Sequence, residues 1–108
     1  MGESEINELI DGILSAVGNK VVSIILYGSV ARGENSEESD VDIAIILSKE
    51  LTKDSKNMLS DNIVDLDLKY DKVYSIVDIK EIDYDKWNKY IPFYINIAKE
   101  GVVLWRAA

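Results

Sequence analysis

The hydrophobic positions at the start of the chain follow first the period of a helix and then the pattern of a strand. Apolar residues recur at helical spacing at Ile6, Leu9, Ile10, Ile13, Leu14 and Val17. This spacing predicts an amphipathic helix, with Ser4 as a candidate N-cap and Gly18-Asn19 as its end. Residues 21–27 (VVSIILY) are almost uniformly apolar and rich in β-branched side chains. They predict a buried strand.

The rest of the chain alternates between strand and helix patterns. The expected elements, in order, are a loop around a short helical turn (28–39), a strand (40–47), a helix (53–70), a strand (72–79), two short helices (83–90 and 93–100) and a last edge strand (102–105). The connection between the first two strands is too long for a tight hairpin. This order predicts one domain, residues 1–108, in which helices cover a small mixed β-sheet, an α+β or α/β sandwich.

Two residue types are missing, and their absence limits the chemistry. The 108 residues include no Cys and no His. Disulfides, thiol nucleophiles, Ser-His-Asp triads and zinc sites built on Cys or His are therefore excluded. Any catalysis must use carboxylates, hydroxyls, lysine, arginine or backbone amides.

The charge distribution bears on partners. Twenty acidic residues against twelve basic ones give a net charge of −8, which repels bare nucleic acid, so we expect no direct nucleic-acid partner. Residues 1–50 contain ten acidic and three basic residues, so the excess lies almost entirely in the first half. No apolar run approaches the length of a membrane span, and the N-terminus lacks the pattern of a signal peptide. We therefore expect a cytoplasmic protein without a membrane partner.

Two aspartates open the second predicted strand. Strand residues alternate between faces, so Asp40 and Asp42 point the same way. Two carboxylates at this spacing can converge on a hard cation such as Mg²⁺ or Mn²⁺, and without one they repel each other and raise a pKa. The alternative is a strand end that emerges into solvent, with Asp40 as a turn residue.

A glycine and a serine follow the first predicted strand directly. Gly28 lets the backbone turn sharply and lets a ligand approach closely. The turn from Ser29 to Arg32 can then present amides and a hydroxyl to a phosphate. The alternative is a plain strand-to-helix turn with Ser29 as N-cap.

Together the two features are more specific than either alone. Gly28-Ser29, ten residues and then Asp40-Val41-Asp42 match the Gly-Ser-x10-Asp-x-Asp pattern of the DNA polymerase β-like nucleotidyltransferase superfamily. The segments 27–33 (YGSVARG) and 39–44 (SDVDIA) closely resemble the small prokaryotic branch, the minimal nucleotidyltransferases.

The resemblance implies roles for these residues. Asp40 and Asp42 would be catalytic and would hold the divalent metal, while Gly28 and Ser29 would hold the phosphates of ATP. AMP would pass to an acceptor hydroxyl and pyrophosphate would leave, a reaction that needs charge neutralisation and in-line positioning more than covalent help. Arg32 either contacts phosphate or pairs with an acidic neighbour, namely Glu34, Glu37 or Glu38.

The resemblance also implies a third carboxylate on the next strand, often the base for the incoming hydroxyl. Asp78 is the only acidic residue of the predicted strand 72–79 and is the candidate for this catalytic role. The family position tends to lie earlier, near Tyr74 or Ser75. If one of these holds it, the set of three carboxylates is incomplete.

The resemblance implies a partner as well. Minimal nucleotidyltransferases of this kind are commonly paired with HEPN-domain ribonuclease toxins, which some of them adenylylate as antitoxins. The chain is too small to hold base, ribose and acceptor alone, so a second subunit or a homodimer would complete the site. The alternative is a catalytically degenerate subunit that neutralises its partner by binding alone. The tail aromatics either pack or form a partner surface: Trp87, Tyr90, Phe93 and Tyr94.

Overall fold

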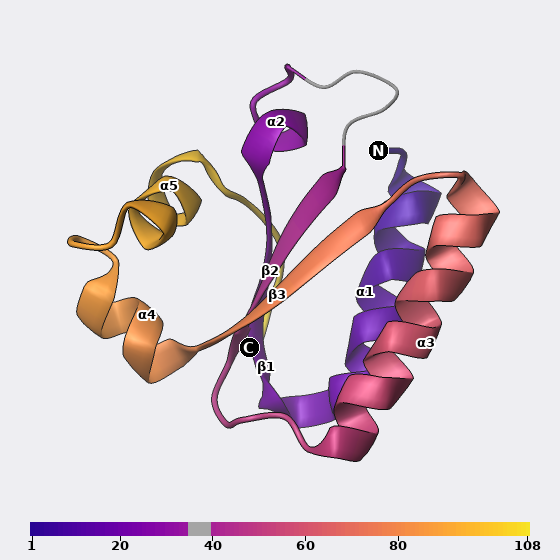
Figure 1. Ribbon diagram of the computed structural model, residues 1–108, viewed down its shortest axis with the longest axis horizontal. Helices are drawn as coiled ribbons and strands as arrows, with labels where there is room; N and C mark the ends of the chain where they lie inside the picture. Colours follow the sequence, from indigo (N-terminus) through magenta and orange to yellow (C-terminus); the bar gives the residue numbers. More distant parts are fainter. Residues whose placement is uncertain (35–39) are drawn as a thin grey trace.

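The computed structural model describes residues 1–34 and 40–108. It confirms the predicted mixture of helices and strands (Figure 1). The elements are α1 (Glu3–Val17), η1 (Gly18–Lys20), β1 (Val21–Tyr27), α2 (Gly28–Ala31), β2 (Val41–Leu47), α3 (Lys53–Tyr70), β3 (Tyr74–Lys80), α4 (Glu81–Trp87), α5 (Pro92–Glu100) and β4 (Val102–Arg106). Over the described residues, no helix combines the length and the apolar character that crossing a membrane requires.

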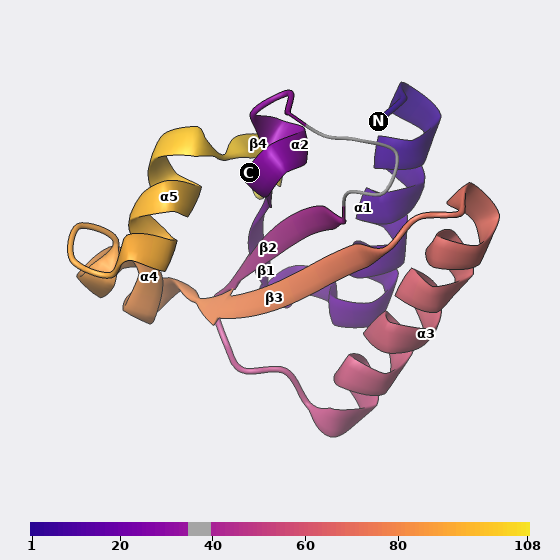
Figure 2. The ribbon, with the colours of Figure 1, turned by 45° about the horizontal axis from the view of Figure 1, so that its top comes forward.

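The four strands form one mixed sheet in the order β3-β2-β1-β4. Strand β1 is antiparallel to both of its neighbours, β2 and β4, whereas β2 and β3 run parallel. Strand β4 lies at an edge, as predicted. Helices α1 and α3 cover one face of the sheet and α4 and α5 lie on the other, so the sheet is the middle layer (Figures 1 and 2).

Each face of the sheet has its own apolar core. The larger one lies toward α1 and α3 and includes Leu9, Ile13, Ile43, Ile45 and Ile63. The smaller one lies toward α4 and α5 and consists of Ile25, Ala44, Ile46, Ile79 and Ile97. Strand β2 contributes to both cores, which explains its nearly continuous apolar sequence. Each fully buried Leu or Ile side chain stabilises the fold by roughly 1.5–3 kcal/mol.

The ends of some elements differ from the sequence-based predictions. Gly2, not Ser4, is the N-cap of α1, and a glycine has no side chain with which to cap this end. Strand β3 begins at Tyr74 rather than at residue 72. Asp71 adopts a left-handed conformation that ends α3, and the side chain of Asp67 then accepts a hydrogen bond from the backbone N–H of Tyr74 at 3.0 Å. The turn at Asp71 and this hydrogen bond place the start of β3 at Tyr74.

A carboxylate is buried where α1 meets the start of β3. The side chain of Glu5 accepts hydrogen bonds from the hydroxyl of Tyr74 and, at 3.0 Å, from the ammonium group of Lys72. Burial alone raises the pKa of Glu5, but the hydrogen bonds from Tyr74 and Lys72 and the charge of Lys72 outweigh it and lower the pKa. The ionised form of Glu5 therefore stabilises the fold.

Replacing Glu5 with glutamine is expected to lower the free energy of unfolding by about 1–3 kcal/mol at neutral pH. Because the folded pKa of Glu5 lies below its ordinary value of 4.5, this stabilisation is present above that pH and is lost as the pH falls through the folded value. Urea unfolding between neutral and acidic pH should show a flatter pH dependence for Glu5→Gln. Glu3→Gln is the control, because Glu3 lies exposed in the same helical turn and should leave the curve unchanged.

Candidate functional site

The site begins where β1 and β2 pair. Tyr27, the last residue of β1, is the register partner of Asp42 in β2. Gly28 follows with a φ of 77°, a conformation that favours glycine. A Cβ atom at Gly28 would lie 3.2 Å from Cγ of Asp42 and would collide with Oδ2 of the same carboxylate. Glycine is thus required here by conformation and by space, and the turn lies directly against Asp42.

The carboxylate of Asp42 sits in an unfavourable electrostatic environment. Its side chain is half-buried, whereas Asp40, just before β2, is exposed. Burial raises the pKa of Asp42, the negative charge of Asp40 raises it further, and the positive charge of Arg32 acts against both. A cation shared by the two aspartates would relieve this repulsion.

The donors of this pair fit a hard divalent metal. Carboxylate oxygens are the ligands that Mg²⁺ and Mn²⁺ prefer, and Mg²⁺ commonly takes one or two carboxylates and completes its octahedron with water and phosphate. Within residues 1–34 and 40–108, no third acidic side chain joins the pair to form a larger metal-binding cluster. Asp40 and Asp42 are therefore the residues that would hold such an ion.

Ser29 lies in the first turn of α2, immediately after Gly28. The N-cap of α2 is Tyr27, so the alternative interpretation of Ser29 as N-cap is wrong. The backbone carbonyl of Ser29 accepts a hydrogen bond from the N–H of Glu34 at 2.9 Å, which fixes the turn. Gly28 thus lies against Asp42, and Ser29 follows it in the same turn.

Arg32 forms two ion pairs at the other end of this turn. Its Nε donates to Glu34 and its Nη1 donates to Glu100, each at 3.1 Å. The pairing with Glu34 was one of the predicted alternatives, and Glu37 and Glu38 lie outside the described residues. Glu100 was missed, because it lies 68 positions away at the end of α5 and no local pattern connects it to Arg32.

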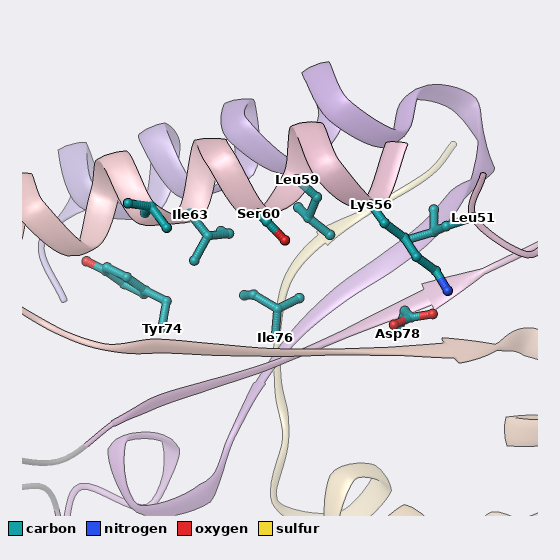
Figure 3. A pocket seen from close by; sticks show the side chains of 9 residues that line it. Leu51, Lys56, Leu59, Ser60, Ile63, Tyr74, Ile76 and Asp78 are labelled. Carbon is teal, nitrogen blue, oxygen red and sulfur yellow. The ribbon is translucent and has the colours of Figure 1, made fainter. Parts of the chain in front are cut away.

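The register of β3 separates Asp78 from the aspartate pair. Ser75 is the partner of Asp42, and Asp78 is the partner of Ile45. Ile45 belongs to the core under α1 and α3, so Asp78 points to the opposite face of the sheet, toward α3 (Figure 3). The prediction that Asp78 supplies the third carboxylate is therefore wrong in this geometry. A serine occupies the position beside Asp42.

Aromatic side chains connect the site to α5. The rings of Tyr27 and Phe93 lie edge to face, 5.6 Å apart. Burial, and then the charge of Asp42, raise the pKa of Tyr27. Tyr94 packs in turn against Tyr84 of α4, with ring centroids 6.0 Å apart. These contacts support the packing interpretation for part of the tail. Phe93 is nevertheless partly exposed, as are Trp87 and Tyr90, whose rings pack edge to face against each other.

Comparison with known proteins identifies the class. Residues 8–107 match the family described as polymerase beta nucleotidyltransferases, and the chain belongs to this family. It is also 35% identical over 104 residues to MJ0604 of Methanocaldococcus jannaschii, which is provisionally named a protein adenylyltransferase. The alignment covers 95% of this chain and 97% of that relative.

Solved structures share the fold. A chain in a toxin–antitoxin structure with AMP-PNP matches 94% of this chain and 73% of its own length, with a TM-score of 0.64 and 21% identity. A chain in the complex of tri-AMPylated Shewanella oneidensis HEPN toxin with MNT antitoxin covers 99% of this chain and 74% of its own length, with a TM-score of 0.62 and 18% identity. These likenesses confirm the predicted nucleotidyltransferase fold.

Proposed function

We propose that this chain transfers AMP from ATP to a hydroxyl group of a partner protein of the HEPN toxin type, and so acts as an antitoxin in the cytoplasm. The observation that carries the proposal is the contact between Gly28 and Asp42, which joins the two halves of the family motif. The relationship to MJ0604 supports a protein as acceptor. The fold shared with the HEPN–MNT complex supports the kind of partner.

Each residue of the site has a separate role in the proposed reaction. The turn at Gly28 and Ser29 holds the phosphates, and the absence of a Cβ at Gly28 leaves room for the Asp42 carboxylate directly beside this turn. Asp40 and Asp42 hold a divalent ion, which supplies charge neutralisation for phosphoryl-type transfer. Arg32 exchanges Glu100 for phosphate when ATP binds, because an exposed ion pair contributes little and is readily replaced.

One observation favours a second function. Ser75, not an acid, stands beside Asp42 in the register, so this position offers no carboxylate base to the acceptor hydroxyl. A chain without that base would still present the same surface to a partner. The second candidate is therefore a degenerate nucleotidyltransferase that neutralises its partner by contact alone.

The experiment that separates the two candidates measures covalent modification. A HEPN-type toxin protein is incubated with this chain, ATP and Mg²⁺, and the intact mass of the HEPN protein is recorded. We expect the mass to rise by one or more AMP units, and we expect no rise with the Asp40→Asn/Asp42→Asn variant. Ser75→Ala is the matched control in β3, because it should retain transfer if Ser75 is not the base.

A stable complex of the two proteins with unchanged mass would contradict the transfer proposal and leave neutralisation by contact. A mass increase that survives the double substitution would contradict the assignment of the aspartates instead. Removal of Mg²⁺ by a chelator should abolish the increase, since the two carboxylates and the phosphates are all anionic and need a cation between them.

A further inference from the structure

A hollow of about 430 Å³ lies between α3 and the edge strand β3, on the face of the sheet opposite Asp42 (Figure 3). We call it the α3–β3 trough. Its apolar lining comes from Leu59 and Ile63 on the helix and Ile76 on the strand. Its volume lies within the usual range for ligand sites. Because the trough is separated from the aspartate pair by the sheet, it has no part in the proposed transfer.

The backbone of β3 is open along one side of the trough. The N–H of Val41 donates to the carbonyl of Val73, and backbone groups alternate in direction along a strand. The N–H and C=O groups of Ile76 and Asp78 therefore point away from β2. Among the described residues, β3 has no strand on that outer side. The corresponding N–H of Tyr74 is already bound by Asp67 at 3.0 Å, so the open edge begins at Ile76.

The helical wall of the trough is exposed and apolar. Val64 lines the trough and retains 51% of its accessible surface, and Leu68, one turn further along α3, retains 77%. Exposed apolar side chains beside an unpaired strand edge form a surface that another strand can cover. Added strands obtain affinity from the backbone and specificity from alternate side chains that enter a pocket.

The far end of the trough carries both signs of charge. The ammonium group of Lys56 points toward the carboxylate of Asp78 (Figure 3). An occupant with a single charge would be attracted by one of these groups and repelled by the other. A hydroxyl or side-chain amide can instead donate to Asp78 and accept from Lys56. The side chain opposite Asp78 should therefore be Ser, Thr, Asn or Gln.

A second copy of this chain does not meet that requirement. Two-fold antiparallel pairing of the open edges centres on Asp78 or on Val77. The first register would place the two Asp78 carboxylates directly opposite each other, and the second would place the apolar Ile76 of each copy opposite Asp78 of the other. Like charges in opposite positions of a sheet are destabilising, and each chain also carries a net charge of −8. The occupant is therefore a different chain.

We propose that the α3–β3 trough docks an extended segment of another protein, which pairs with β3 as an added strand. An apolar residue of this segment lies opposite Ile76 and enters the trough. Two positions along, a residue with a hydroxyl or an amide side chain lies opposite Asp78. The added strand hydrogen-bonds to the backbone of Ile76 and Asp78.

The test uses a random-peptide library displayed on phage and selected against the full chain. The enriched peptides should carry an apolar residue followed two positions later by Ser, Thr, Asn or Gln. A synthetic consensus peptide should lose about tenfold in affinity on Val64→Glu. Met58→Glu is the matched control, because Met58 is equally exposed on α3, at 50%, yet does not line the trough. Hydrogen exchange at Ile76 and Asp78 should slow when the peptide binds.

Three results would overturn the proposal. The first is a selection that enriches no peptide over a blank surface. The second is a consensus peptide that binds Val64→Glu as tightly as the unaltered chain, with equal melting temperatures for the two proteins. The third is a chain that sediments as a dimer and becomes a monomer on Val64→Glu, because a second copy would then cover the trough.

Discussion

Asp42→Asn is expected to reduce AMP transfer by roughly 10³-fold or more, because the change removes a group that acts on the charge of the transition state. The fold should remain. Burial and Asp40 raise the pKa of Asp42, so its ionised form is disfavoured in the folded chain. The neutral asparagine should therefore leave the melting temperature in the absence of metal equal or higher, while the transfer rate, measured by partner mass, falls.

A second measurement compares how Mg²⁺ changes the melting temperature of the unaltered chain and of the Asp42→Asn variant. Mg²⁺ should raise the melting temperature of the unaltered chain, since a ligand that binds only the folded state stabilises it. Asp42→Asn should show a smaller shift. An equal shift in both proteins would place the ion elsewhere, and a lower melting temperature of the variant without metal would mean that Asp42 supports the fold rather than straining it.

Gly28→Ala is expected to reduce AMP transfer by about 10²-fold, because the new Cβ displaces the Asp42 carboxylate and small misplacements are costly in catalysis. The left-handed backbone also costs an alanine about 1–2 kcal/mol of stability. Steady-state transfer rates and urea unfolding measure the two effects separately.

Gly33→Ala is the matched control for that substitution. Gly33 has a φ of 73°, close to the 77° of Gly28, but a Cβ at Gly33 meets no atom of the described residues within 4 Å. Both variants should therefore lose stability through the left-handed backbone, Gly28→Ala by at least as much as Gly33→Ala, and only Gly28→Ala should lose transfer. Equal activity in both variants would show that the contact between Gly28 and Asp42 has no catalytic consequence.

The elements that the sequence located best are those with strong local patterns. The ranges of β1 and α3 agree with the predictions at both ends, because β1 is a nearly continuous apolar run and α3 carries buried residues at helical spacing, namely Leu59, Ile63 and Leu66. The N-terminus of α1 was misplaced, since Ser4 is a good capping residue by type but lies inside the helix that Gly2 starts. Local propensity cannot settle which of several permissive residues begins a helix.

The aspartate pair and the glycine turn were identified from the motif, and the structure brings them together. The error at Asp78 had a physical cause. Its face depends on how β3 is aligned with β2, and parallel register is set by packing on both sides of the sheet rather than by the strand itself. The partner of Arg32 at Glu100 and the burial of Glu5 are likewise long-range contacts, which no local pattern encodes.

Asp42 lies in an interior strand, and Gly28 directly follows another. This location affects how the protein loses its activity on heating. Tyr27 and Asp42 are paired between β1 and β2, the two interior strands, and such strands belong to the cooperative units that open last. Fraying of the edge strands or of α4 and α5 leaves this pairing intact. Thermal inactivation would then coincide with global unfolding, and native-state fluctuations would alter partner docking before they alter the reacting centre.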